Sequence, residues 1–220
     1  MEARNRLILS EGHSLAWSLL LMRALDFAGL TPCDTRTIHR TIYFANVLAP
    51  IYDVRPPIEL VMRDARGPYY PSIQHCIDRL CVFGFVHVQD LRVEIVGTLA
   101  TQLGSYAISS EGVKKCRMWV DQLEWARSTS QYLTDVASAL SSRPDDFVEC
   151  AERFDETYNR PGSRTTARVI SFGPVSGNET ARVSELIRQM TPTDRRPVPQ
   201  QAVKLYLSYL NQIGMKRSAA

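Results

Sequence analysis

The stretch of residues 67–112 constrains the fold of this chain more than any other part. It opens with Gly-Pro-Tyr-Tyr-Pro-Ser, and the apolar residues of 71–83 then recur at helical spacing. Residues 85–88 and 92–96 alternate between apolar and polar as strands do, and 106–108 supply a return strand. A helix, a two-stranded wing and a further helix in this order are the layout of a winged helix-turn-helix.

Helical periodicity continues on both sides of this stretch. The other predicted helices cover residues 10–28, 35–48, 110–125, 131–140, 145–158, 179–190 and 199–213. Residues 159–178 hold proline, glycine and serine around one short β-prone run, and we expect a mobile loop there. The predicted fold is therefore mainly α with a small β wing: a winged helix-turn-helix region at 1–115 and a helical C-terminal region at 116–220.

The charge of the chain is mildly basic and evenly spread. The net charge is +3, of which residues 1–115 hold +1 and the remainder holds +2. A protein that binds DNA mainly by electrostatic attraction usually has a stronger basic bias. Arginine outnumbers lysine 22 to 4, which indicates either phosphate recognition or the codon bias of a GC-rich genome. The overall charge therefore leaves DNA binding open without favouring it.

A winged helix that reads DNA places the helix before the wing in the major groove. In that mode we expect base contacts from Gln74, His75 and Arg79, and phosphate contacts from Arg36, Arg40 and Arg66. Asp78 opposes these contacts because it lies beside the phosphates. The wing tip at 97–104 contains neither lysine nor arginine. These features favour a protein partner over DNA.

Three further segments are candidates for contacts with a partner. The turn at 67–72 presents Tyr69 and Tyr70. The loop at 159–178 carries Arg160, Arg164 and Arg168 with no acidic residue among them, a pattern that suits phosphate or an acidic protein surface but also an ordinary solvated loop. The last helix has an apolar stripe that either packs on its own domain or forms a homodimer. Its residues are Leu205, Tyr206, Tyr209, Leu210 and Ile213.

The sequence contains no recognisable set of catalytic, metal-binding or cofactor-binding residues. His75, Cys76 and Cys81 are the residues nearest to a metal cluster, but their spacing does not build a tetrahedral site. The acids at 145–156 suit the start of a helix, and the lysine that usually accompanies them in a metal-dependent nuclease is missing. We therefore predict a protein that is not an enzyme and has no catalytic residue, metal or cofactor.

The cysteines and the apolar segments indicate the compartment. The five cysteines include no CxxC pair. The apolar run at 7–9 is too short for a signal peptide, and Arg23 and Asp26 interrupt the run that begins at 19 well short of a membrane span. We expect a cytoplasmic protein with reduced thiols and no membrane segment.

Two motifs resemble those of a known family. Thr41-Ile42-Tyr43-Phe44-Ala45 resembles the LLYFA of the Panacea (SocA-like) phage-associated family. Arg66-Gly67-Pro68-Tyr69-Tyr70-Pro71 resembles the GP-aromatic-S turn of that family and of the middle components of ABC-type three-component defence systems. The resemblance spans residues 35–115, and Leu80–Val86 and Tyr106–Gly112 fit the motifs that frame winged helices generally. It implies a non-enzymatic subunit or regulator from a bacterial mobile-element or antiviral defence operon.

Two hypotheses about function follow from the sequence. In the first, the chain is a non-enzymatic winged-helix adaptor subunit of such a complex and acts by protein recognition. In the second, it is a dimeric winged-helix transcription regulator that binds DNA.

Overall fold

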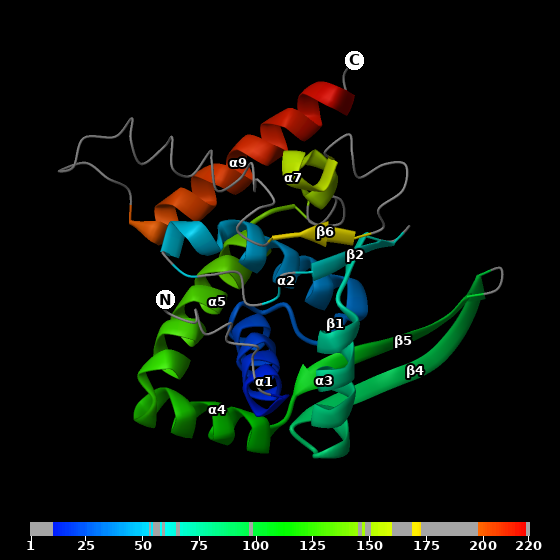
Figure 1. The fold of residues 1–220 in the computed structure, drawn as a ribbon, viewed down its shortest axis with the longest axis vertical. Helices are drawn as coiled ribbons and strands as arrows, with labels where there is room; N and C mark the ends of the chain where they lie inside the picture. Colours follow the sequence, from blue (N-terminus) through cyan, green and yellow to red (C-terminus); the bar gives the residue numbers. More distant parts are fainter. Residues whose placement is uncertain are drawn as a thin grey trace, which may run out of the picture.

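The computed structural model describes residues 11–52, 54, 58, 60–64, 67–96, 99–144, 147, 151–159, 169–172 and 198–218. Within these residues the protein is mainly helical, with small antiparallel sheets at one side (Figure 1). The elements of the first half are α1 (Glu11–Phe27), β1 (Cys33–Asp34), α2 (Thr35–Leu48), the 3-10 turn η1 (Ala49–Tyr52), β2 (Leu60–Asp64), β3 (Gly67–Tyr69), α3 (Pro71–Val82), β4 (Val86–Val96) and β5 (Leu99–Ile108).

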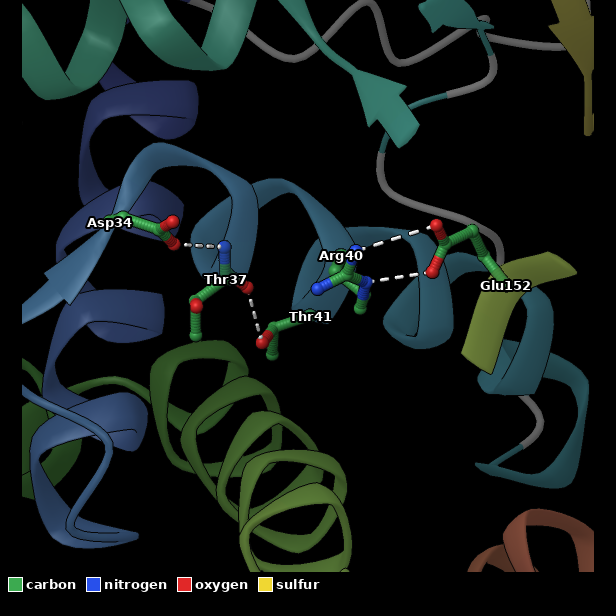
Figure 2. Close-up of polar contacts among 5 residues, drawn as sticks. All are labelled: Asp34, Thr37, Arg40, Thr41 and Glu152. Carbon is green, nitrogen blue, oxygen red and sulfur yellow. Dashed lines mark hydrogen bonds and ion pairs between the residues drawn. The ribbon is translucent and has the colours of Figure 1, made fainter. Parts of the chain in front are cut away.

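Helix α2 begins where the sequence predicts it. The carboxylate of Asp34 accepts a hydrogen bond from the backbone N–H of Thr37 at 2.8 Å, which caps the helix (Figure 2). One turn later the hydroxyl of Thr41 donates to the carbonyl of Thr37. Residues 38–48 are all buried, so α2 lies inside the protein and its polar side chains need internal partners.

The chain after α3 forms a long antiparallel hairpin. Strand β4 pairs with β5 from Val86–Ile108 to Val96–Leu99, with an irregularity between Gln89 and Arg92. The short strand β1 adds to the base of β5, which gives the order β1-β5-β4. Beyond that base the hairpin projects away from the body of the protein (Figure 1). The predicted strands are thus confirmed and are longer than expected.

Two strands of a second sheet, β2 and β3, lie between α2 and α3 in the sequence. Strand β2 pairs with β3 on one side and with β6 (Val169–Ser171) on the other, both antiparallel. A helix-turn-helix usually has a short turn at this place. The prediction of a mobile loop at 159–178 is wrong for Val169–Ser171, because this β-prone run finds a partner in β2, more than a hundred residues away in sequence. Residues 160–168 and 173–178 of that loop lie outside the described part of the chain.

The second half is helical but more interrupted than predicted. Its elements are α4 (Ser110–Gln122), α5 (Glu124–Ser141), the 3-10 turn η2 (Ala151–Phe154), α7 (Glu156–Asn159) and α9 (Pro199–Ser218). Leu123 is extended, so the helix predicted at 110–125 breaks there and α5 begins at once. Asp155 also interrupts the helix predicted at 145–158. Its side chain accepts hydrogen bonds from the N–H groups of Thr157 and Tyr158, which starts α7 as a separate helix. The helix predicted at 179–190 lies outside the described residues.

The buried residues of both halves form one hydrophobic core. It extends from Trp17 in α1 to Leu210 in α9, and α1 packs against α5 as well as α3 and α4. No helix among the described residues is long and apolar enough to cross a membrane.

Candidate functional site

Helix α3 and the hairpin after it are where the sequence places the candidate interaction surface. Of the residues predicted to contact bases, His75 is exposed, whereas Gln74 and Arg79 are half-buried. The guanidinium of Arg79 lies 5.6 Å from the ring centre of Phe83. The apolar side chains Val82 and Phe83 are 83% and 53% exposed at the end of the helix. The outward face of α3 therefore combines a histidine, an arginine and an apolar end.

The side chain of Gln74 makes hydrogen bonds within the protein, in contrast to the prediction that it contacts a base. Its Oε1 lies 3.2 Å from Nε2 of His39 in α2. Its Nε2 donates to Oδ1 of Asp78 at 2.8 Å and lies 3.5 Å from the hydroxyl of Tyr106. Both ends of the amide are thus engaged, and the bidentate contact that a glutamine makes with adenine would break these bonds.

Burial keeps His39 in its neutral form, and two hydrogen bonds fix its tautomer. Its Nδ1 accepts from the backbone N–H of Tyr70 at 3.2 Å, so the proton is on Nε2 and is directed to Gln74. Burial lowers the pKa of His39 to about 4, and the hydrogen bond to Gln74 acts in the opposite direction. Tyr69 packs against the imidazole, with 4.7 Å between the ring centres. His39 therefore joins α2 to the start of α3.

Tyr70 does not lie on the surface, and its predicted role in partner binding is wrong. Its side chain is fully buried, and its hydroxyl accepts a hydrogen bond at 3.0 Å from Nδ2 of Asn46 in α2. Tyr69, the other aromatic residue of the turn, is half-buried and remains a candidate. The two tyrosines are adjacent in an extended segment, and successive side chains there point to opposite sides.

Arg40 was predicted to contact phosphates, and this prediction is wrong as well. Its side chain is 6% exposed and points to Glu152, whose side chain is fully buried (Figure 2). Nε of Arg40 donates to Oε2 of Glu152 at 2.7 Å, and Nη2 lies 3.4 Å from Oε1. This two-pronged ion pair joins α2 to η2 within the core. A guanidinium held in this way cannot reach a phosphate on a duplex. Arg36, one turn earlier, is exposed.

A second buried carboxylate joins three helices. Oδ1 of Asp155 accepts from the hydroxyl of Tyr43 in α2 at 3.0 Å, and Oδ2 accepts from the hydroxyl of Tyr206 in α9. Burial and the charge of Asp155 raise the pKa of Tyr43 well above its usual value, so the phenol keeps the proton that it donates. The sequence alone does not predict this cluster. A carboxylate placed before a short helix indicates a cap, but nothing nearby in the sequence indicates the two tyrosines.

Gly67 is required where the second sheet meets the Arg40–Glu152 pair. Its φ is +125°, and an added Cβ would lie 3.2 Å from Oε1 of Glu152. We expect Gly67→Ala to lower the free energy of unfolding by about 2 kcal/mol, because it adds backbone strain and crowds a buried ion pair. Gly84 is the matched control, since its φ is +75° and a Cβ there meets open space. For Gly84→Ala we expect a loss of about 1 kcal/mol, the backbone cost alone. Urea denaturation of both variants measures the difference, and equal losses would contradict the proposed crowding.

The thiols of the described region are not activated for nucleophilic chemistry. Cys33, Cys76, Cys81 and Cys116 are all free. Burial raises the pKa of Cys33 and of Cys116 to about 12. Burial and the charge of Asp78 raise the pKa of Cys81, which is only half-buried, to about 11. Among the described residues, no three side chains of histidine, cysteine or acid type group as metal ligands would.

The remaining predicted residues lie in α9 or outside the described chain. Tyr206 and Leu210 of the α9 stripe are buried in the protein's own core, whereas Leu205 and Tyr209 are 56% and 49% exposed. The stripe predicted as one surface is therefore divided between the core and solvent. Arg66, Arg160, Arg164 and Arg168 lie outside the described residues.

The sequence matches no protein-family model, and no curated protein matches it.

Proposed function

We propose that this protein is a non-enzymatic winged-helix subunit that acts by recognising another protein. The order α1, β1, α2, α3 and the β4–β5 hairpin supports a winged helix, as does the addition of β1 to β5. The sheet between α2 and α3 is then an insertion into the helix-turn-helix. The resemblance of 41–45 and 66–71 to the Panacea family and to components of defence systems supports a bacterial defence or mobile-element complex as its setting.

The observation that carries the proposal is the chemistry of α3 and the wing. On α3, Asp78 and Arg79 cancel in charge. In the hairpin at 86–108, one arginine stands against two acids, so the wing has a net charge of −1. A duplex repels such a wing, because phosphate contacts supply most of the affinity of DNA binding. The exposed Val82 and Phe83 suit a protein surface, where apolar and aromatic residues supply most of the binding energy.

The test uses variants of these two exposed residues. We expect the tagged full-length protein, expressed in its native host, to retain a defined protein partner that the double variant Val82→Asp/Phe83→Asp loses at least tenfold. Met215→Asp in α9 is the matched control, since Met215 is 67% exposed and belongs to another surface. Equal retention of the partner by both variants would refute α3 as the recognition surface.

The alternative function is a winged-helix transcription regulator that binds DNA. The exposed Arg36 and His75, together with Arg79, are the described residues that support it. Fluorescence anisotropy with a labelled random-sequence duplex at low and at physiological salt tests it. We expect no binding at micromolar protein, because too few basic residues face the duplex. Micromolar binding that weakens steeply with salt and is lost in Arg79→Ala would establish the regulator instead.

A further inference from the structure

Strand β4 is an edge strand along its full length. It pairs with β5 on one side, and on the other side it has no strand partner in the described part of the chain. Strand β1 covers β5 only at 105–106, so the outer part of the hairpin projects away from the body (Figure 1). An edge of this kind presents a row of backbone N–H and C=O groups that another strand can pair with.

The outer part of β4 has few of the features that normally protect an edge. The irregularity in β4 lies between Gln89 and Arg92, where Asp90 has a φ of 52°. Beyond it the pairing is regular from Arg92 to position 96, and these positions contain neither lysine nor proline. Leu91 and Val93 are 55% and 66% exposed. Residues 92–96 are therefore a regularly paired strand edge, and the described side chains at 91–93 are exposed.

The sequence of this edge is complementary to itself. Positions 91–95 read Leu-Arg-Val-Glu-Ile, so apolar and charged residues alternate in the same order from either end. The two charged positions carry opposite charges. An antiparallel copy with a two-fold axis at Val93 places Arg92 opposite Glu94 of the copy. By symmetry it also places Glu94 opposite Arg92 of the copy. It also brings Leu91, at the end of the irregularity, to the position across from Ile95 of the copy. Unlike charges and apolar pairs directly opposite each other stabilise an antiparallel pair.

We propose that the protein forms a homodimer in which β4 pairs antiparallel with β4 of a second copy about a two-fold axis at Val93. The β1-β5-β4 sheets of the two copies then become one sheet of six strands. The proposal does not depend on the partner of α3, because it uses the edge of the wing and not the exposed end of that helix.

Other registers of the same edge are disfavoured by charge. An axis at Arg92 places arginine opposite arginine and Asp90 opposite Glu94, and an axis at Glu94 places glutamate opposite glutamate. An axis between two residues places charged residues opposite apolar ones. The free edge of β5 at 99–104 contains no charged residue, so nothing in it selects a register. Only the axis at Val93 matches every position from 91 to 95.

The interface is small, and we expect a weak dimer with a dissociation constant in the micromolar range, about 1 to 100 μM. Sedimentation equilibrium from about 1 μM to 1 mM therefore tests it on the full-length protein. Arg92→Glu and Glu94→Arg each place like charges opposite each other twice, and we expect each to weaken dimerisation by at least about tenfold. The double variant restores unlike pairs and should recover the dimer. Arg117→Glu on the exposed side of α4 is the control for the change in net charge.

Cross-linking tests the position of the axis. A cysteine introduced by Val93→Cys lies opposite its own copy, so oxidation should give a disulfide-linked dimer. Leu91→Cys is the matched control, because two such residues lie four positions apart along the strands, about 13 Å. Peptide mapping by mass spectrometry separates this linkage from the native cysteines, and melting temperatures confirm that all variants fold.

Three results would overturn the proposal: a protein that stays monomeric up to about 1 mM, equal cross-linking at positions 91 and 93, or a dimer that neither charge reversal weakens. The last result would place the interface elsewhere, with the exposed Leu205 and Tyr209 of α9 as the next surface to test.

Discussion

Glu152→Ala is expected to destabilise the protein by about 3–5 kcal/mol, the largest effect that we predict for a single substitution. Glu152 is fully buried, and its carboxylate faces the guanidinium of Arg40, which is itself 6% exposed. Without the carboxylate, a positive charge remains in the core, away from water. Arginine does not lose its proton in proteins, so neutralisation gives no relief. Urea denaturation followed by circular dichroism measures the loss.

The double variant Arg40→Met/Glu152→Leu separates the cost of removing the carboxylate alone from the contribution of the ion pair as a whole. A buried ion pair replaced by apolar residues of similar volume is often neutral or even stabilising. We therefore expect the double variant to recover most of the stability that Glu152→Ala loses. If Glu152→Ala costs less than about 1 kcal/mol, the pair contributes no more than a surface ion pair does, and the assignment of Arg40 to the core would be refuted.

Stability is expected to fall by about 3 kcal/mol as the pH is lowered from 7 to 4, because of His39 alone. The unfolded chain binds a proton at this histidine near its usual pKa of 6.5, whereas burial keeps the folded protein unprotonated until about pH 4. The contribution is thus fully present above pH 6.5 and is lost as the pH falls toward 4. Protonation of Nδ1 would also break the hydrogen bond from the N–H of Tyr70.

His39→Gln is the control for this pH dependence. An amide can accept from the N–H of Tyr70 and donate to Gln74, but it does not titrate. The free energy of unfolding should therefore fall less between pH 7 and pH 4 in the variant than in the wild type. The expected difference between the two losses is about 3 kcal/mol, measured by denaturation at both pH values. Parallel pH profiles for the two proteins would show that His39 is not the titrating group.

The local features of the fold could be predicted from the sequence. The cap at Asp34 and the proline at the start of α3 set two helix starts within one residue. Gly84 has a φ of +75° and follows Phe83, the C-cap of α3, as a glycine that ends a helix commonly does. Apolar alternation predicted the β4–β5 hairpin. Each of these signals acts between residues close to one another in sequence.

The candidate site was less predictable, because exposure depends on the rest of the fold. The spacing along a helix says which residues share a face, but it does not say how many sides of that helix are covered. Helix α2 is buried over all of 38–48, so Arg40, which was predicted on the surface, lies in the core. Gln74 was predicted to contact a base, yet its side chain is half-buried and its amide is used by His39 and Asp78.

The sequence by itself therefore determined where α1, α2, α3 and the β4–β5 hairpin lie, because caps, prolines and hydrophobic periodicity act over a few residues. Only the tertiary structure decided which polar groups are internal. Arg40 meets Glu152, and Tyr43 meets Asp155, each across 112 positions of sequence. A buried charge is stable only beside its partner, and the packing of the whole core brings these partners together. The same packing left α3's apolar end and the edge of β4 exposed, which are the two surfaces on which the proposals rest.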